Sequence, residues 1–245
     1  MNAASVRIES PDGSVACRVY HPEGAGAWPA VIWYMDGMGI RPSLLGMAQR
    51  LASSGYFVLV PDLYHRAGDY PPFDPATLQD DPLEQARILE LVRTVTNAGV
   101  MRDTAAFLGC FDRQPQVRGH AVGCVGYCMG GPLALCAAGS FPERVAAAAS
   151  FHGANLATDR PDSPHLLAPK MRAKVYVGVA EFDPYLFPGE TPRIDAALRE
   201  AGVDYALEMY PGCKHGFALD GSHGYERDAY ERHWQRLLEL FRATL

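Results

Sequence analysis

The segment Gly126–Gly131, which reads Gly-Tyr-Cys-Met-Gly-Gly, constrains the fold more than any other part of this chain. It follows the apolar run His120–Val125 and leads into the small apolar residues 132–138. That order predicts a strand, a sharp turn and a helix. The flanking glycines let the chain pass closely through the turn, which leaves Cys128 at its apex. A thiolate there is stabilised by the free N–H groups and the positive end of the helix dipole. A small buried cysteine in a glycine-rich turn would give the same pattern.

Two further polar residues follow predicted strands. The apolar run Lys174–Val179 leads to Asp183, and the alternating run Tyr205–Tyr210 leads to His215. The carboxyl ends of parallel strands border the ligand crevice of an open α/β sheet, so these side chains are expected to meet Cys128. Nucleophile, acid and histidine occur in the order of α/β-hydrolases. The sequence therefore predicts a triad of Cys128, Asp183 and His215.

The rest of the chain alternates predicted strands with predicted helices. This pattern predicts one domain, residues 1–245, with the α/β-hydrolase fold and no large lid domain. The expected sheet is mostly parallel and doubly wound, with an antiparallel N-terminal hairpin. The main segments are a hairpin over Val6–Tyr20, buried strands over Ala30–Tyr34 and Tyr56–Val60, a helix over Pro42–Ser54, and a helix over Pro82–Phe111 that is broken near Asn97–Gly99.

Composition narrows the possible partners of the 245-residue chain. A net charge of −6 argues against a surface that binds nucleic acid or anionic membranes. The six cysteines show no zinc-type spacing, and we expect mostly reduced thiols. No apolar stretch approaches membrane-spanning length, and the first residues lack the apolar core of a signal peptide. We expect a cytoplasmic monomer or small homo-oligomer that acts on a small molecule without a metal or other cofactor.

At this point the chain resembles the dienelactone hydrolases, which are cysteine members of the α/β-hydrolase fold. The segments that carry the resemblance are Gly126–Gly131, Phe182–Asp183, His215–Phe217 and Pro61–Tyr64. Together they span most of the chain, from about Val31 to Phe217. The resemblance implies that Cys128 is the nucleophile, His215 the base and Asp183 the acid that orients the base.

The resemblance also implies roles for residues around the triad. The family has an acidic residue after its first parallel strand that steadies the resting nucleophile. Asp36 holds that place, where a longer Glu is expected. Backbone N–H groups of Gly37 and Met129 are expected to bind the oxyanion of the tetrahedral intermediate.

A third set of residues concerns the substrate. In the family, an arginine after the segment Pro61–Tyr64 helps to hold a substrate carboxylate, and Arg66 follows Tyr64 at that place. The resemblance therefore implies that Tyr64 and Arg66 contact the substrate. A second family arginine lies four residues beyond the catalytic histidine, where this chain has Leu219. Half of the expected clamp is therefore missing, and the sequence favours neutral esters or lactones.

The predicted reaction is hydrolysis of a small ester or lactone through a thioester acyl-enzyme, with a carboxylesterase or thioesterase on neutral substrates as an alternative. Glu181 is a second candidate for the acid, and His152 ends a strand near the expected crevice. A glutamine amidotransferase would have Glu where Phe217 stands. A redox pair of Cys124 and Cys128 is disfavoured by their different settings. A non-catalytic binding module stays open.

Overall fold

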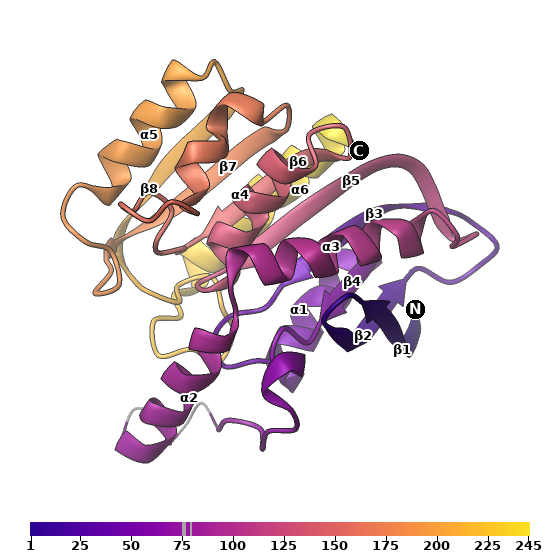
Figure 1. Ribbon diagram of the computed structural model, residues 1–245, viewed down its shortest axis with the longest axis horizontal. Coiled ribbons are helices and arrows are strands. Elements are labelled where there is room, and N and C mark those ends of the chain that lie inside the picture. Colours follow the sequence, from indigo (N-terminus) through magenta and orange to yellow (C-terminus); the bar gives the residue numbers. More distant parts are fainter. Residues whose placement is uncertain (75–76, 79) are drawn as a thin grey trace.

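Eight strands form one sheet in the computed structural model, which describes residues 1–74, 77–78 and 80–245 (Figure 1). The strands are β1 (Asn2–Ser10), β2 (Gly13–His21), β3 (Trp28–Tyr34), β4 (Phe57–Pro61), β5 (Val117–Tyr127), β6 (Val145–Phe151), β7 (Lys174–Phe182) and β8 (Tyr205–Lys214). Their order across the sheet is β1-β2-β4-β3-β5-β6-β7-β8. β2 is antiparallel to both β1 and β4, and the remaining neighbours are parallel. The expected mostly parallel sheet with an N-terminal hairpin is confirmed.

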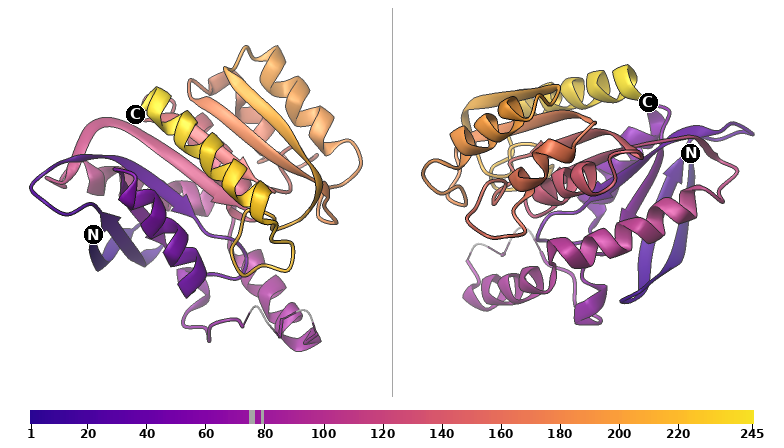
Figure 2. Two further views of the ribbon diagram at one scale, coloured as in Figure 1. Left: turned by 180° about the vertical axis from the view of Figure 1, so that it is seen from behind. Right: turned by 45° about the horizontal axis from the view of Figure 1, so that its top comes forward.

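Helices cover both faces of this sheet. The helical segments are α1 (Pro42–Ser53), η1 (His65–Ala67), α2 (Pro82–Thr94), α3 (Asn97–Phe111), α4 (Gly130–Ser140), η2 (Pro164–Lys170), α5 (Glu190–Glu200) and α6 (Arg227–Thr244). α3, α4 and α5 lie on one face, whereas α1 and α6 lie on the other (Figures 1 and 2). Burial on both faces explains why the central strands are almost continuously apolar. No described helix combines the length and apolarity needed to cross a bilayer.

The predicted break in the long helical region separates α2 from α3. Thr96 is the N-cap of α3, and its side chain accepts a hydrogen bond from the Gly99 N–H at 3.1 Å. α2 begins with its own cap, because the Asp81 carboxylate accepts from two N–H groups of the first turn and Pro82 follows it. Two separately capped helices can leave the sheet in different directions. α2 extends from the body of the molecule, whereas α3 packs along it (Figures 1 and 2).

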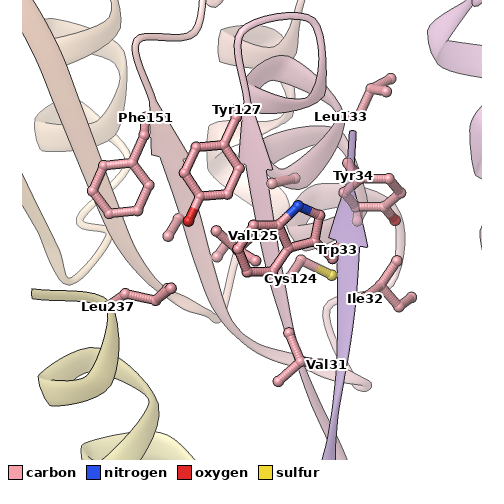
Figure 3. Close-up of a cluster of buried hydrophobic side chains, with 14 of the residues drawn as sticks. Val31, Ile32, Trp33, Tyr34, Cys124, Val125, Tyr127, Leu133, Phe151 and Leu237 are labelled. Atoms are coloured by element: carbon pink, nitrogen blue, oxygen red, sulfur yellow. The ribbon is translucent and has the colours of Figure 1, made fainter. Parts of the chain in front are cut away.

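An aromatic stack ties the three central strands together (Figure 3). The rings of Trp33 and Tyr127 stack with centroids 4.8 Å apart, and those of Tyr127 and Phe151 stack at 5.5 Å. These side chains come from β3, β5 and β6, and Leu237 of α6 lies over the same face in Figure 3. The stack fixes the carboxyl ends of the three strands level with one another, and the candidate site lies at that edge.

Candidate active site

The turn between β5 and α4 holds Cys128 in a left-handed backbone conformation, with a φ of 52°. A side chain at Gly126 would place its Cβ 1.9 Å from the Gly130 carbonyl oxygen. A side chain at Gly130 would place its Cβ 2.3 Å from the Tyr34 carbonyl oxygen. Glycine is therefore required at both positions. The positive φ turns the partly exposed, free thiol of Cys128 out of the tightly packed turn.

His215 and Asp183 meet at the ends of β8 and β7. The Nδ1 atom of His215 lies 2.7 Å from Oδ2 of Asp183, whose side chain is 0% exposed. The second oxygen, Oδ1, accepts a hydrogen bond from the Tyr185 N–H at 3.0 Å. With one oxygen on each partner, the carboxylate has a fixed direction toward the imidazole. Glu181, the other candidate acid, instead accepts from the Gly212 N–H at 2.6 Å.

The electrostatic surroundings favour a positively charged His215. Burial lowers the pKa of this histidine, but its hydrogen bonds to Asp183 and to the neighbouring Cys128 outweigh burial and raise the pKa to about 10. The Nε2 atom has no other partner among the described residues. With Nδ1 committed to Asp183, Nε2 is the nitrogen available to the thiol.

The loop after β3 is held by a buried ion pair. Nη2 of Arg41 lies 2.7 Å from Oδ2 of Asp36, and both side chains are almost completely buried. Oδ1 of Asp36 accepts from the Met38 N–H at 2.7 Å and from Nη1 of Arg41 at 2.8 Å. Next to this pair, the Tyr64 hydroxyl donates to the Gly37 carbonyl at 2.6 Å. These bonds fix the backbone of the loop beside Cys128.

A cavity of about 890 Å³ opens onto these groups. Cys128, His215, Asp183 and Gly37 line it, together with apolar side chains from several parts of the chain. The apolar lining residues are Met38, Leu78, Ile88, Leu89, Phe182, Pro184, Tyr185 and Leu219. The described residues include no group of three or more His, Cys, Asp or Glu side chains that could hold a metal ion.

Comparison with known proteins assigns the family. The sequence model of the Dienelactone hydrolase family matches residues 15–245. The chain belongs to the dienelactone hydrolase family. A Synechocystis protein provisionally named carboxymethylenebutenolidase is 27% identical over 243 residues, which cover 98% of this chain and 96% of that protein. A crystal structure of a Klebsiella pneumoniae protein, provisionally named a dienelactone hydrolase, aligns with a TM-score of 0.84 and 25% identity over 98% of both chains. The protein is therefore a hydrolase, and ester hydrolysis is the activity of its family.

In this dienelactone hydrolase family member, Arg66 lies away from the cavity, contrary to the expected clamp. Its guanidinium contacts Asp103 of α3 at 2.8 Å and Asp12 of the β1–β2 turn at 2.7 Å. It also donates to the Gly99 carbonyl at 2.9 Å. Its charge therefore joins the N-terminal hairpin to α3, and the described lining of the cavity does not support the expected contact of Arg66 with substrate. His65 contacts the same Asp103 at 3.1 Å and is likewise not available to substrate.

Asp36 and Tyr64 both bind groups of the loop after β3. The carboxylate of Asp36 is occupied by Arg41 and the Met38 N–H, and no bond joins it to the Cys128 thiol among the described contacts. The geometry assigns it to the shape of the loop. Tyr64 is buried, does not line the cavity and supports the Gly37 carbonyl. Its hydroxyl supports the loop after β3, and the contact of Tyr64 with substrate stays a prediction.

Leu219 lines the cavity with an almost fully buried side chain, so the position expected to hold a family arginine does face the site. His152 lies beside His215 and is not part of the cavity lining. Its ring packs against that of His215 with centroids 4.9 Å apart. Burial and the nearby His215 hold the pKa of His152 well below its usual range, so it is neutral.

Three contributors to the site escaped the sequence analysis: Arg41, Tyr185 and α2. The ring of Tyr185 meets that of His215 at 4.6 Å, from the exposed side. Its place two residues after Asp183 at a strand end was the available signal. Arg41 is five residues from Asp36, a spacing that carries no periodic signal in a loop. The apolar residues of α2 have the spacing of a helix that packs on a core, so the sequence did not indicate that α2 lines the cavity.

Proposed function

We propose that this hydrolase cleaves carboxylic esters or lactones through Cys128, His215 and Asp183. The position of His215 carries the proposal: Asp183 holds Nδ1 at 2.7 Å, and Nε2 is left to the neighbouring thiol at the edge of the cavity. Nucleophile, base and orienting acid in this arrangement form the constellation of covalent acyl transfer. We also propose that residues 1–245 act as one domain, since the site draws on elements from β3 to β8.

In the first half-reaction, the thiol proton of Cys128 passes to Nε2 of His215 and forms the imidazolium that the raised pKa of His215 favours. The thiolate sulfur attacks the carbonyl carbon, and the carbonyl electron pair moves to oxygen. The N–H groups of Gly37 and Met129 bind this oxyanion. When the tetrahedral intermediate collapses, the C–O bond to the leaving group breaks and the imidazolium returns its proton to the departing oxygen. The products are an alcohol and a thioester on Cys128.

In the second half-reaction, water replaces the alcohol. An acylated sulfur carries no charge, so the contribution of the free thiol to the raised pKa of His215 disappears. The neutral imidazole can then take a proton from water as the oxygen attacks the thioester carbon. The C–S bond breaks, the sulfur recovers its proton from His215, and the carboxylic acid leaves. Asp183 keeps the imidazole in one orientation through both steps.

The charges around the cavity favour neutral substrates. Arg41 and Arg66 are both bound to carboxylates of the protein. Among the described lining residues, the cationic side chain outside the triad is Lys214, which is exposed, and His223 is the remaining basic residue. A buried substrate carboxylate needs charge-assisted partners to offset its desolvation. The lining therefore supports a neutral ester or lactone over a carboxylated dienelactone.

The test is turnover of p-nitrophenyl acetate by the wild type, Cys128→Ala and Cys110→Ala. Cys110 is a free, partly buried thiol in α3, outside the cavity lining, and serves as the matched control. The proposal predicts that Cys128→Ala loses at least 10³-fold in kcat/KM while Cys110→Ala stays within about twofold of the wild type. Equal activity in all three proteins would exclude Cys128 as the nucleophile.

A further inference from the structure

The helix α2 presents apolar side chains to the cavity as well as to the core. Within α2, whose residues are all described, only Leu91 is buried. Gln85, Ile88 and Leu89 line the cavity, and their spacing of three and four residues puts them on one helical face. Leu89 keeps 53% of its surface exposed. A surface helix normally turns its apolar stripe toward the core; here Ile88 packs partly against the core, whereas Leu89 is left exposed at the cavity.

A second apolar wall belongs to the segment that follows the acid. Phe182 and Tyr185 line the same cavity, and both rings are well exposed. Leu219 adds a buried apolar surface to the lining. The cavity therefore has apolar side chains from α2 and from the end of β7, with Cys128 among the residues that line it.

The size of the cavity decides what fits these walls. At about 890 Å³ it lies near the upper end of the roughly 300–1,000 Å³ found for pockets that bury drug-sized ligands. A small lactone would reach the thiol but leave the Leu89 and Tyr185 side chains in water. A longer apolar group would cover them, and covering apolar surface is favourable in proportion to its area.

We propose that the substrate is an ester with an extended apolar substituent, an alkyl chain or aryl group, that lies between α2 and the Phe182–Tyr185 segment. The inference rests on the proposed function, because the reacting carbonyl must lie at Cys128. It goes beyond that function by assigning the substrate class and the residues that select it. Ile88 and Leu89 on one side and Phe182 and Tyr185 on the other are the specificity-determining residues.

The experiment measures kcat/KM for p-nitrophenyl esters from acetate to octanoate, and for alkyl acetates of the same chain lengths. In at least one series, kcat/KM should rise by up to about fourfold per added methylene, the factor for moving a CH₂ group out of water. A flat or falling dependence in both series overturns the inference. Cys128-dependent acetate turnover would still stand in that case, so the two proposals fail separately.

Matched variants on α2 locate the effect. Leu89→Gln should lower kcat/KM for the preferred long ester at least fivefold more than for the acetate, because it places an amide in the apolar wall. Leu83→Gln is the control, since Leu83 lies on the same helix, is 80% exposed and does not line the cavity. It should leave the long-to-short ratio within about twofold of the wild type. Equal ratios in both variants and the wild type would show that α2 does not contact the substrate.

Discussion

The β5–α4 turn and the helix α2 both border the cavity, but they are built in opposite ways. In the turn, backbone packs on backbone so closely that a methyl group at Gly126 would overlap the Gly130 carbonyl. In α2, one residue of the helix is buried, and Leu83 and Leu89 are largely exposed. The turn therefore fixes the position of Cys128 through the main chain. The surface of α2 is set by side chains that can change with little effect on folding, which suits a role in substrate choice.

The largest effect is expected where the turn is tightest. Gly126→Ala should abolish activity and lower the free energy of unfolding by about 3 kcal/mol, because the added methyl group forces the turn open. The open-space control is Gly46→Ala in α1, where a Cβ meets no atom within 4 Å. It should raise stability by about 0.5–1 kcal/mol and leave activity unchanged. Urea unfolding and kcat measurements test both variants. An active, stable Gly126→Ala protein would contradict the packing account.

The next effect concerns the pair that activates the thiol. Asp183→Asn and His215→Asn should each lower kcat by roughly 10²–10⁴ through loss of the oriented base. The double variant should be little worse than either single variant, since the two residues act as a unit. Glu181→Gln should stay near the wild type, because the Glu181 carboxylate binds the Gly212 N–H. Strictly additive losses for Asp183 and His215 would remove Asp183 from the triad.

A smaller effect is expected in the cavity wall. Leu219→Arg should shift kcat/KM about tenfold toward carboxylated dienelactones, which corresponds to roughly 1.4 kcal/mol of differential transition-state binding. Arg66→Gln is the contrasting variant. It should lower stability, because buried Asp103 loses its cation, but leave substrate preference unchanged. A wild type that already strongly prefers dienelactone, with a preference insensitive to Leu219→Arg, would contradict the neutral-substrate account.

The smallest effect is a change in the pH dependence of stability. Burial keeps the pKa of His152 well below its usual range, and burial likewise lowers the pKa of His233 to about 3. Below a pH of about 6.5 the unfolded chain binds protons at these positions while the folded chain does not, so stability falls as pH decreases. Each histidine contributes up to about 1.4 kcal/mol per pH unit in that range.

His152→Phe should remove one of these contributions, so the loss of unfolding free energy between pH 6 and pH 5 becomes smaller by up to about 1.4 kcal/mol. Urea unfolding at both pH values measures it. His215 acts in the opposite sense: its raised pKa of about 10 stabilises the fold below pH 6.5, and this contribution is lost as pH rises toward 10. An identical pH dependence in the wild type and His152→Phe would show that His152 is protonated in the folded state.

The contrast between the turn and α2 also explains what the sequence could predict. The grouping of Cys128, Asp183 and His215 at the carboxyl ends of the strands could be predicted from local patterns. Each of the three residues comes soon after an apolar strand. The partners of Arg66 could not be inferred in that way, because Asp12 and Asp103 lie 54 and 37 residues away in the sequence. Family position placed Arg66 near the substrate, whereas packing of the hairpin against α3 places it elsewhere.

The wall formed by α2 was missed for a different reason. Helical periodicity predicts that a helix has an apolar face, but it does not say whether that face covers a core or a cavity. Leu89 would fit the helical period whether its side chain covered a core or a cavity. The Asp36–Arg41 ion pair lies in a loop, where no periodic pattern exists to identify it. Tertiary structure determines both the surroundings of the apolar face of α2 and the pairing of Asp36 with Arg41.

The central claim is that Cys128 is the nucleophile that His215 activates. The most direct test is peptide mass mapping of the wild type after a rapid acid quench during the first turnover of p-nitrophenyl acetate. The account predicts an acetyl group on the peptide that contains Cys128, formed at the rate of the p-nitrophenol burst and lost as the acid product appears. An acetyl group on another residue, or turnover with an unmodified Cys128 throughout the burst, would contradict it.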